Sequence, residues 1–332
     1  MVTANAAALL LQHYVDNFRR LPWRAAPGEP PPDPYRVWLS EVMLQQTTVA
    51  AVTPRFERFV GRWPTIEALA AAPDEEILSE WAGLGYYARA LNLIACARQV
   101  ARRGSFPATA VELRMLPGVG EYTSAAIATI AFGEPVAAVD TNVQRVISRL
   151  HALRVASRAQ IETLVREMLP EGRAGDFTQA LMDLGATICR PKAPLCGQCP
   201  LRQHCHGFCS GSPEAFPAPK ERRQRPHKNG IAYWTERSGQ VWLVRRPREG
   251  LLGGMAALPG TEWTGAAIVR ANPIGTVRHV FTHFSLDLHV VPRAEPKGEG
   301  WWHPIDRLAD AGLPTLYLRA AEIALGEQKR AA

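Results

Sequence analysis

The chain has 332 residues, about twice the size of an average domain, which predicts at least two domains. Hydrophobic residues make up 47% of it and charged residues 21%, which suits a folded chain and excludes a largely disordered one. The formal net charge of +7 favours a polyanionic partner such as DNA or RNA, and the absence of a run of about 18 apolar residues excludes a membrane-spanning helix.

The N-terminus does not have the features of an export signal. It carries no early positive charge, and its apolar run, Ala6 to Leu11, is too short for a signal peptide. We therefore expect a cytoplasmic protein, associated with the nucleoid if its partner is DNA.

Residues 1–209 are expected to form an all-helical domain. Apolar side chains recur with the i, i+3, i+4, i+7 spacing of a helix in two clear places. They are Tyr35, Trp38, Leu39 and Val42, and then Val143, Val146, Ile147 and Leu150. Glycines and prolines such as Gly83, Gly104 and Pro107 mark boundaries between helices.

Glu41 is the first candidate catalytic residue. It lies in the apolar helix 37–44, and its i+4 and i+7 neighbours, Gln45 and Thr48, continue a narrow polar stripe. A glutamate on the protein surface is the simpler interpretation. If the stripe lines a pocket instead, apolar surroundings raise the pKa of Glu41 and keep its carboxyl protonated.

The segment 116–123 has the sequence Leu-Pro-Gly-Val-Gly-Glu-Tyr-Thr and precedes a helical stretch. Gly118 and Gly120 allow a tight turn that presents successive backbone N–H groups at the start of a helix, an arrangement that captures an anion such as a DNA phosphate. For the two glycines alone, a plain turn is the better interpretation. With apolar helices on both sides and a cysteine cluster downstream, the segment resembles a helix-hairpin-helix DNA-binding motif.

Asp140 is the second candidate catalytic residue. It follows the apolar run 136–139 and precedes a helix, so its simplest role is that of an N-cap, worth about 1 kcal/mol. The same position keeps a carboxylate ionised, because the helix N-terminus and its N–H donors favour the anion. A neutral carboxyl at Glu41 and an ionised one at Asp140 would make the acid and stabilising-anion pair that acts on glycosidic bonds.

Five of the six cysteines lie between positions 189 and 209, and four of them have the spacing C-x6-C-x2-C-x5-C. Disulfides are not expected, because cytosolic thiols are kept reduced. Zinc sites usually consist of two separated C-x2-C pairs, so this compact loop favours a [4Fe-4S] cluster, with zinc as the alternative. The expected ligands are Cys189, Cys196, Cys199 and Cys205, whereas Cys209 is a spare thiol and Cys96 a core residue.

Basic residues are concentrated around this loop. Residues 189–228 contain eight Lys or Arg and two Glu, and Arg190, Lys192 and Arg202 lie between the expected ligands. A metal-bound loop could hold these cations against a DNA backbone of any sequence. A solvated basic linker without a partner is the alternative, and residues 210–228, with four prolines, are expected to connect two domains.

Residues 229–332 are expected to form an α+β domain, because the hydrophobic period changes to two. The runs 231–235 and 241–246 flank Ser238 and Gly239 and predict a hairpin with a loop longer than two residues. Between 284 and 290 apolar and polar residues alternate, which predicts a strand with one buried face.

Taken together, these motifs resemble those of the MutY-type adenine DNA glycosylases. The resemblance covers nearly the whole chain and rests on Glu41 with residues 45–47, and on the segments 83–87, 116–123, 139–142 and 189–205. It implies a helix-hairpin-helix glycosylase domain with a [4Fe-4S] cluster and a C-terminal Nudix-like domain. It also implies a monomer that removes adenine mispaired with 8-oxoguanine or guanine in double-stranded DNA.

The resemblance assigns catalytic roles to four residues. The adenine must leave the base stack, because its glycosidic bond cannot be reached inside a duplex. Glu41 then protonates N7 of the flipped base, and Asp140 stabilises or traps the oxocarbenium character left on the sugar. Asn142 orients groups around that carboxylate, and Tyr122 positions the pair.

The resemblance also assigns DNA contacts. Gln46 and Tyr86 match positions that wedge into the strand near 8-oxoguanine, and Gly118 and Gly120 hold a phosphate. Simple core packing is the alternative for Tyr86 and for Tyr122. Endonuclease III-type enzymes have a lysine at the position of Tyr122, and tyrosine cannot form their Schiff base, so the resemblance predicts a monofunctional enzyme that leaves an abasic site.

The C-terminal domain departs from the MutY pattern at one position. The family commonly has Phe-Ser-His in a loop that touches 8-oxoguanine, and this chain has Phe281, Thr282 and His283 there. Threonine keeps the hydroxyl but adds a methyl group and stiffens χ1. The REx2EE core of Nudix pyrophosphatases is absent from residues 253–262, so we expect no nucleotide hydrolysis by this domain.

Two further classes of function fit parts of the sequence. A non-catalytic iron–sulfur protein that binds DNA and senses redox state would use the cluster and the hairpin, but would not need Glu41, Asp140 and Tyr122 together. A Nudix-type nucleotide hydrolase with a helical appendage would need the carboxylates that residues 253–262 do not supply.

Overall fold

The structure is a computed structural model that describes residues 2–81, 83–86, 88–219, 225–247, 250–267, 272–281 and 283–331. The chain divides into two compact units. Unit 1 comprises Met1–Ala71 and Asn92–Glu221, and unit 2 comprises Ala72–Leu91 and Arg222–Ala332.

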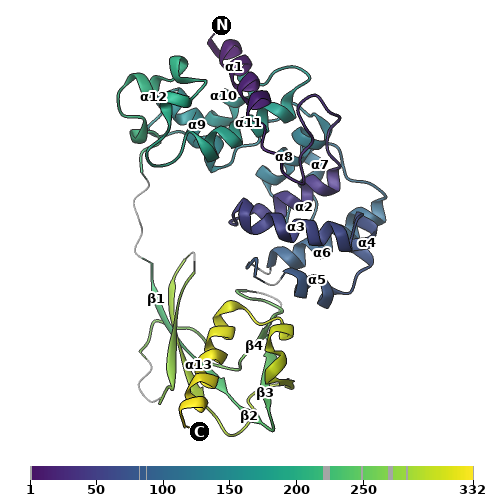
Figure 1. Cartoon of the computed structure of the whole chain (residues 1–332), viewed down its shortest axis with the longest axis vertical. Coiled ribbons are helices and arrows are strands. Elements are labelled where there is room, and N and C mark those ends of the chain that lie inside the picture. The colour runs from purple at the N-terminus through teal and green to yellow at the C-terminus, as the bar shows by residue number, and fades with distance from the viewer. Residues whose placement is uncertain are drawn as a thin grey trace. The chain divides into compact units, whose positions relative to one another are not determined.

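Unit 1 is built from helices, as the sequence predicts (Figure 1). Helix α6 (Ala88–Arg103) begins in unit 2 and continues into unit 1. The other α-helices of unit 1 are α1 (Val2–Asp16), α2 (Pro34–Leu44), α3 (Val49–Arg62), α4 (Ile66–Ala71), α7 (Ala110–Leu113), α8 (Glu121–Phe132), α9 (Thr141–Leu150), α10 (Arg158–Met168), α11 (Ala174–Thr187) and α12 (His206–Cys209). After α11, the described residues of unit 1 also form three short 3₁₀ helices. These are η1 (Cys196–Gln198) and η2 (Arg202–His204), which precede α12, and η3 (Pro213–Ala215), which follows it.

Polar side chains fix where several of these helices begin. Asp33 caps α2, Thr48 caps α3 and Ser157 caps α10, each by accepting a backbone N–H of the first turn. Such caps satisfy N–H groups that have no partner inside the helix, and each contributes about 1 kcal/mol. Asp140 caps α9 in the same way, and its carboxylate lies at the pocket described below.

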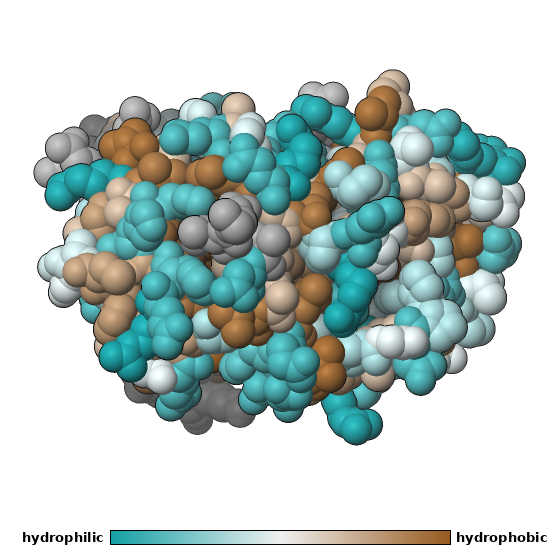
Figure 2. Space-filling model, turned by 90° about the horizontal axis from the view of Figure 1, so that it is seen from above, coloured by the Kyte–Doolittle hydropathy of each residue, from teal (hydrophilic) through white to brown (hydrophobic). Residues whose placement is uncertain are grey.

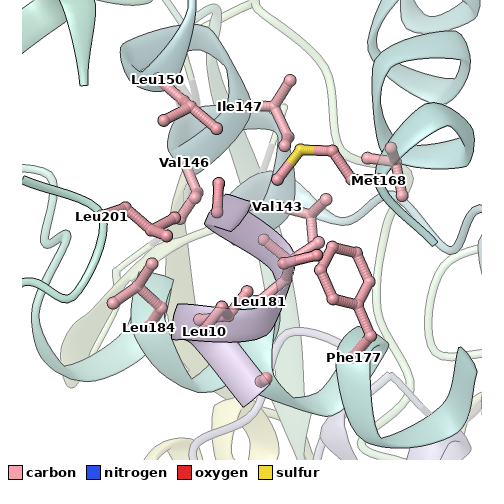
Figure 3. Close-up of a cluster of buried hydrophobic side chains, with 14 of the residues drawn as sticks. Leu10, Val143, Val146, Ile147, Leu150, Met168, Phe177, Leu181, Leu184 and Leu201 are labelled. Atoms are coloured by element: carbon pink, nitrogen blue, oxygen red, sulfur yellow. The ribbon is translucent and has the colours of Figure 1, made fainter. Parts of the chain in front are cut away.

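One hydrophobic cluster of unit 1 lies where α1, α9, α10 and α11 pack together (Figure 3). Leu10, Val143 and Phe177 are fully buried in it. Each large apolar side chain removed from water in this way contributes roughly 1.5–3 kcal/mol. The apolar stripe that the sequence predicts at 143–150 is therefore the face by which α9 is held in place.

The described residues of unit 2 form two sheets and two α-helices that lie wholly within this unit (Figure 1). One sheet has the order β1-β6-β5, with β1 parallel to β6 and β5 antiparallel to it, and α13 packs on these strands. In the other, β3 pairs with β2, β4 and β7, all antiparallel. The elements are α5 (Asp74–Trp81), β1 (His227–Trp234), β2 (Glu236–Arg237), β3 (Gln240–Arg245), β4 (Ala256–Ala257), β5 (Gly275–Val280), β6 (Ser285–Pro292), β7 (Gly300–Pro304), the 3₁₀ helix η4 (Ile305–Ala311) and α13 (Thr315–Ala331).

The strand predicted between 284 and 290 is β6, and its apolar residues are buried on one face, as expected. The hairpin prediction is partly wrong. Residues 231–234 do not pair with 241–246, because they belong to β1, which pairs with β6 instead. Thr235 alone reaches the second run, by accepting the backbone N–H of Trp242 at 2.9 Å. Only the short β2 pairs with β3 across Ser238 and Gly239, and this turn has two residues, both with positive φ.

No helix among the described residues combines the length and the apolar composition needed to cross a membrane. Figure 2 shows hydrophilic side chains spread over the face that it presents, with hydrophobic ones between them.

Candidate active site

A pocket of about 780 Å³ opens in unit 1. It is lined by side chains from α2, α8, α9 and α11 and by the segments before and after α2. All four residues predicted to be catalytic contribute to its lining: Glu41, Tyr122, Asp140 and Asn142. Residues that are about 100 positions apart in the sequence thus line one cavity.

Glu41 lies on the buried face of α2, and only 8% of the residue is exposed. Burial raises the pKa of its carboxyl to about 7, and the negative charge of Asp140 acts in the same direction. A hydrogen bond from Tyr122 and the positive charge of Arg24 oppose this shift. The carboxyl is therefore able to hold a proton near neutral pH and to release it to a base in the pocket.

Tyr122 is the second residue of α8, and its ring fills the space beside Glu41. Burial raises the pKa of its phenol well above the usual range, and the nearby charges of Glu41 and Asp140 raise it further. Its hydroxyl also lies 3.9 Å from Sδ of Met182. Tyr122 thus stays neutral and acts as a hydrogen-bond donor in the pocket.

Asp140 is the N-cap of α9. Its Oδ1 accepts the backbone N–H of Val143 at 2.7 Å, and its Oδ2 accepts Nδ2 of Asn142 at 2.9 Å. Both donors and the positive end of the helix stabilise a negatively charged carboxylate. The N-cap that the sequence predicts is present, and the carboxylate faces the same pocket as Glu41.

Arg145, which the sequence analysis did not single out, extends this network. Its Nη2 donates to Oδ1 of Asn142 and to the carbonyl of Gly185, both at 2.8 Å. Its Nε donates to the carbonyl of Cys189 at 2.8 Å. A continuous path of hydrogen bonds therefore joins Asp140 to the backbone of the first cysteine of the loop.

The pocket also contains an ion pair that the sequence analysis missed. Arg24 donates to both carboxylate oxygens of Asp183, at 2.5 and 3.0 Å, and Arg19 donates to one of them at 3.0 Å. The side chains of Arg24 and Asp183 are 8% and 13% exposed, so the pair is largely shielded from water. The two residues are 159 positions apart, and no local pattern in the sequence indicates that they meet.

The predicted hairpin forms between α7 and α8. Gly118 has a φ of +72°, and a β-carbon there would lie 2.6 Å from Cβ of Asn92. Gly120 is the N-cap of α8 and has no side chain to accept the N–H groups of the first turn. The helix therefore begins with donors that an external anion can satisfy.

The two residues predicted to wedge into DNA share an unusual backbone conformation. Gln46 has a φ of +57° and Tyr86 a φ of +50°, in the left-handed region that costs a residue with a β-carbon about 1 kcal/mol or more. Residue Tyr86 is 45% exposed, and the Arg89 guanidinium lies 5.3 Å from the centroid of its ring. Strained conformations of this kind cluster at functional sites.

The four predicted ligands, Cys189, Cys196, Cys199 and Cys205, all line one small cavity together with apolar side chains. No group of three or more His, Cys, Asp or Glu in the described part of the chain is arranged to hold a single metal ion. Four cysteines that line one cavity supply the four thiolates that a [4Fe-4S] cluster uses as ligands.

Arg149 supports the same interpretation. It is 2% exposed, donates to the carbonyls of Arg190 and Pro191 at 2.7 and 3.0 Å, and its Nη1 lies 3.5 Å from Sγ of Cys189. Burial raises the pKa of the Cys199 thiol to about 12 and also raises the pKa of Cys196 and Cys205, and the positive charge of Arg149 opposes this shift at Cys196. The residues present therefore fit a cluster held by four thiolates.

The other predicted cysteines and cations lie as follows. Cys96 is fully buried and Cys209 is exposed. Lys192 and Arg202 are exposed, whereas Arg190 is half-buried and donates to the carbonyl of Ala193 at 2.9 Å. Two of the three cations of the loop are thus exposed, and the Arg202 guanidinium lies 4.7 Å from the centroid of the Phe208 ring.

The predicted lesion-reading residues lie at the turn between β5 and β6 of unit 2. Thr282 lies outside the described residues. Phe281 is half-buried, and His283 is exposed. The backbone N–H of Phe281 donates to the carbonyl of Phe284 at 2.8 Å and closes the turn.

Comparison with known families identifies both parts of the chain. Residues 39–171 match the HhH-GPD superfamily of base excision DNA repair proteins, and residues 230–322 match the NUDIX domain. The matches agree with the helical and Nudix-like architecture expected from the sequence.

Curated relatives share one name. The chain is 35% identical to the adenine DNA glycosylase of Homo sapiens, over 85% of this chain and 65% of the human protein. It is 41% identical to that of Mycobacterium tuberculosis, over 68% of this chain and 72% of the relative. It is 39% identical to the adenine DNA glycosylase of Mycolicibacterium smegmatis, over 64% of this chain and 73% of the relative.

Solved structures are similar over the helical part. A thermostable thymine-DNA glycosylase aligns with a TM-score of 0.56 and 30% identity, over 61% of this chain and 95% of that one. A trapped endonuclease III–DNA covalent intermediate aligns with a TM-score of 0.53 and 26% identity, over 62% of this chain and 95% of that one.

Proposed function

The chain belongs to the adenine DNA glycosylases of the HhH-GPD superfamily, hydrolases of N-glycosyl bonds in base excision repair, and on this premise we propose which mispair it repairs and how. Its substrate is adenine opposite 8-oxoguanine or guanine in double-stranded DNA. The product is an abasic site, and the strand is left uncut.

One observation carries this proposal. Glu41 and Asp140 line the same pocket, one with a pKa raised by burial to about 7 and the other held by two hydrogen-bond donors at a helix N-terminus. A carboxyl kept neutral and a carboxylate kept ionised are the two groups that cleavage of a glycosidic bond requires.

Glu41 acts as the general acid. The flipped adenine enters the pocket, and the Glu41 proton passes to N7, which makes the base a better leaving group. Tyr122, which stays neutral, holds the Glu41 carboxyl in place through its hydroxyl. The proton donor is thus fixed in the orientation that the base needs.

Asp140 acts on the sugar. As the bond to adenine breaks, positive charge develops at the anomeric carbon, and the carboxylate stabilises it electrostatically or forms a transient bond with it. Asn142 holds Oδ2 through its amide, and Arg145 holds Asn142 in turn. Water completes the hydrolysis.

The pocket supports a monofunctional reaction. Tyr122 occupies the position at which endonuclease III-type enzymes have a lysine, and no lysine is among the residues that line the pocket. A tyrosine phenol cannot form a Schiff base with the opened sugar. Borohydride should therefore trap no covalent complex between the protein and its DNA.

We propose that Cys189, Cys196, Cys199 and Cys205 hold a [4Fe-4S] cluster. When bound, the cluster would supply Fe–S bonds that cross-link residues 189–205 into one loop. The loop presents Lys192 and Arg202 to the phosphate backbone, and Gly118 and Gly120 present the N-terminus of α8.

Lesion recognition is assigned to the turn that carries Phe281, Thr282 and His283. Gln46 and Tyr86 enter the base stack near the oxidised base. Backbone strain at both residues and the exposure of Tyr86 and His283 support these contacts.

The decisive experiment is single-turnover release of adenine from duplexes in which the opposing base is 8-oxoguanine, guanine or thymine. We expect the fastest release opposite 8-oxoguanine, slower release opposite guanine and very little opposite thymine. Protein that binds these duplexes but releases no adenine would contradict the proposal and favour a non-catalytic DNA-binding role.

A further inference from the structure

An aromatic row in unit 2 ends at the turn between β5 and β6. The Trp263 indole stacks on Phe281 with ring centroids 5.6 Å apart and an interplanar angle of 26°. It also lies 6.2 Å from Phe284, and the two phenylalanine rings are 4.8 Å apart. One indole therefore contacts both residues that flank the tip of the turn.

The backbone of unit 2 makes room for this indole. Gly230 on β1 lies directly beside it, and a β-carbon at Gly230 would overlap Cδ1 of Trp263. The segment around the indole is held to β1 by paired backbone hydrogen bonds between Asn229 and Thr264. The indole thus packs into a space that the absence of a side chain at Gly230 provides, and the segment that carries it is fixed to β1.

Two cations complete the row. The Arg246 guanidinium lies 5.0 Å from the Trp263 ring and donates to the hydroxyl of Tyr317, a buried residue of α13. At the other end, Nζ of Lys228 lies 4.7 Å from the Phe284 ring. Cations over aromatic faces add attraction to stacking, so the row ties the turn both to α13 and to β1.

The row holds the two phenylalanines between which His283 lies. Phe281 and Phe284 are anchored by Trp263 and by the hydrogen bond between their backbones, while His283 between them is exposed. When Phe281 and Phe284 are already fixed, less ordering is needed for His283 to meet a base.

We propose that Trp263 is a positioning residue for the lesion-reading turn and thereby sets the preference for 8-oxoguanine over guanine opposite adenine. This inference rests on the proposed function, since it assumes that the turn reads the lesion. Trp263 itself acts through Phe281 and Phe284 and need not touch the DNA.

The test compares three variants in single-turnover adenine release opposite 8-oxoguanine and opposite guanine. Trp263→Leu keeps an apolar side chain but removes the stacking plane, and we expect the ratio of the two rates to fall about tenfold. Trp263→Phe restores a ring and should recover most of that ratio. Trp302→Leu removes one member of another aromatic pair in unit 2, Trp242 with Trp302, and should leave the ratio as in the wild type.

A merely structural role for Trp263 would lower the melting temperature and both rates while leaving their ratio unchanged, and that outcome would overturn the inference. A double-mutant cycle gives a second check. Gly230→Ala displaces the indole, so it should lower the ratio by itself but add little to Trp263→Leu. If the effects of the two changes on the rate ratio were fully additive, Gly230 would not act by making room for the indole, and the inference would be contradicted.

Hydrogen exchange of the intact protein separates this inference from the proposed function. The Phe281 amide should lose protection in Trp263→Leu and keep it in Trp302→Leu, whatever the enzyme excises. If the wild type shows no preference for 8-oxoguanine, the recognition function fails. If Phe281 stays equally protected in Trp263→Leu, the positioning role fails.

Discussion

At the scale of single residues, two carboxyl groups share one pocket in different surroundings. Glu41 has apolar neighbours and one tyrosine donor, whereas Asp140 has a backbone N–H and an amide aimed at its two oxygens. The same functional group is thus suited to give up a proton at one position and to keep a negative charge at the other.

Asp140→Asn should separate binding from chemistry. The amide keeps the shape of the side chain but removes its charge, so single-turnover release of adenine should fall by at least about 100-fold. Affinity for the duplex should stay within about threefold, because phosphate contacts dominate it. Asp310→Asn, at an exposed pair with Arg307, should release adenine at the wild-type rate; equal loss in both variants would contradict the assignment.

Glu41 should set the alkaline limit of the reaction. Its pKa of about 7 means that the proton donor is lost as the pH rises above that value. The single-turnover rate should therefore fall by up to about tenfold per pH unit on the alkaline side. A rate that stays constant from about pH 6 to pH 9 would show that Glu41 is not the acid.

The same carboxyl should also affect stability. In the unfolded chain it is protonated only below about pH 4.5, and in the folded protein below about 7, so the folded state binds more protons between these values. The wild type therefore loses stability as the pH rises through this window. Glu41→Gln has no such titration, and its advantage in unfolding free energy should grow from about pH 5 to about pH 8 by on the order of 3 kcal/mol. Denaturant titrations at several pH values would measure it.

At the scale of elements, the hairpin between α7 and α8 depends on glycine for two separable reasons. Gly118 and Gly133 have nearly the same φ, +72° and +70°, but only at Gly118 would a β-carbon meet another residue, Asn92. The pair therefore allows backbone conformation and steric contact to be measured apart.

Gly133→Ala should cost about 1–2 kcal/mol of stability, because an L-residue is strained at that φ. Gly118→Ala should cost roughly 1–3 kcal/mol more, since Asn92 must also move. If the hairpin holds a phosphate, only Gly118→Ala should weaken DNA binding, by several-fold. Equal binding losses in the two variants would argue against that contact.

The sequence predicts some of these elements well and others poorly, for physical reasons. The N-cap at Asp140 and the apolar face of α9 depend on neighbours within one or two turns, and both are present. The partner of β1 depends instead on burial shared with a strand more than 50 residues away, which no local pattern specifies. The expected hairpin is therefore wrong for β1, although β2 pairs with β3 across Ser238 and Gly239.

The residues of the candidate site also divide into those that a local sequence pattern indicates and those that only the complete fold brings together. Glu41 and Asp140 each carry a local signal, an apolar helix and a helix start, and the structure places both in one pocket. The ion pair of Arg24 and Asp183 is formed by chain segments that only the complete fold brings together, and neither residue stands out in the sequence. Arg145 is a third such case, because its partners lie on α9, on α11 and at Cys189.

At the scale of the whole molecule, the cysteine loop can be tested by chemistry that does not depend on activity. Cys199→Ser should lose most of the roughly four iron atoms expected per chain and should melt at a lower temperature. Cys209→Ser lies in the same segment, but Cys209 is exposed and does not line the cavity, so its iron content and melting temperature should match the wild type. Iron retained at the wild-type level in Cys199→Ser would contradict the ligand set.

The parallel pairing of β1 with β6 determines how unit 2 would respond to mechanical tension. Eight residue pairs join these strands in one continuous register, from His227 opposite Ser285 to Trp234 opposite Pro292. A pull along the N-terminal end of β1 loads this ladder in shear, so its bonds share the force and do not open one after another.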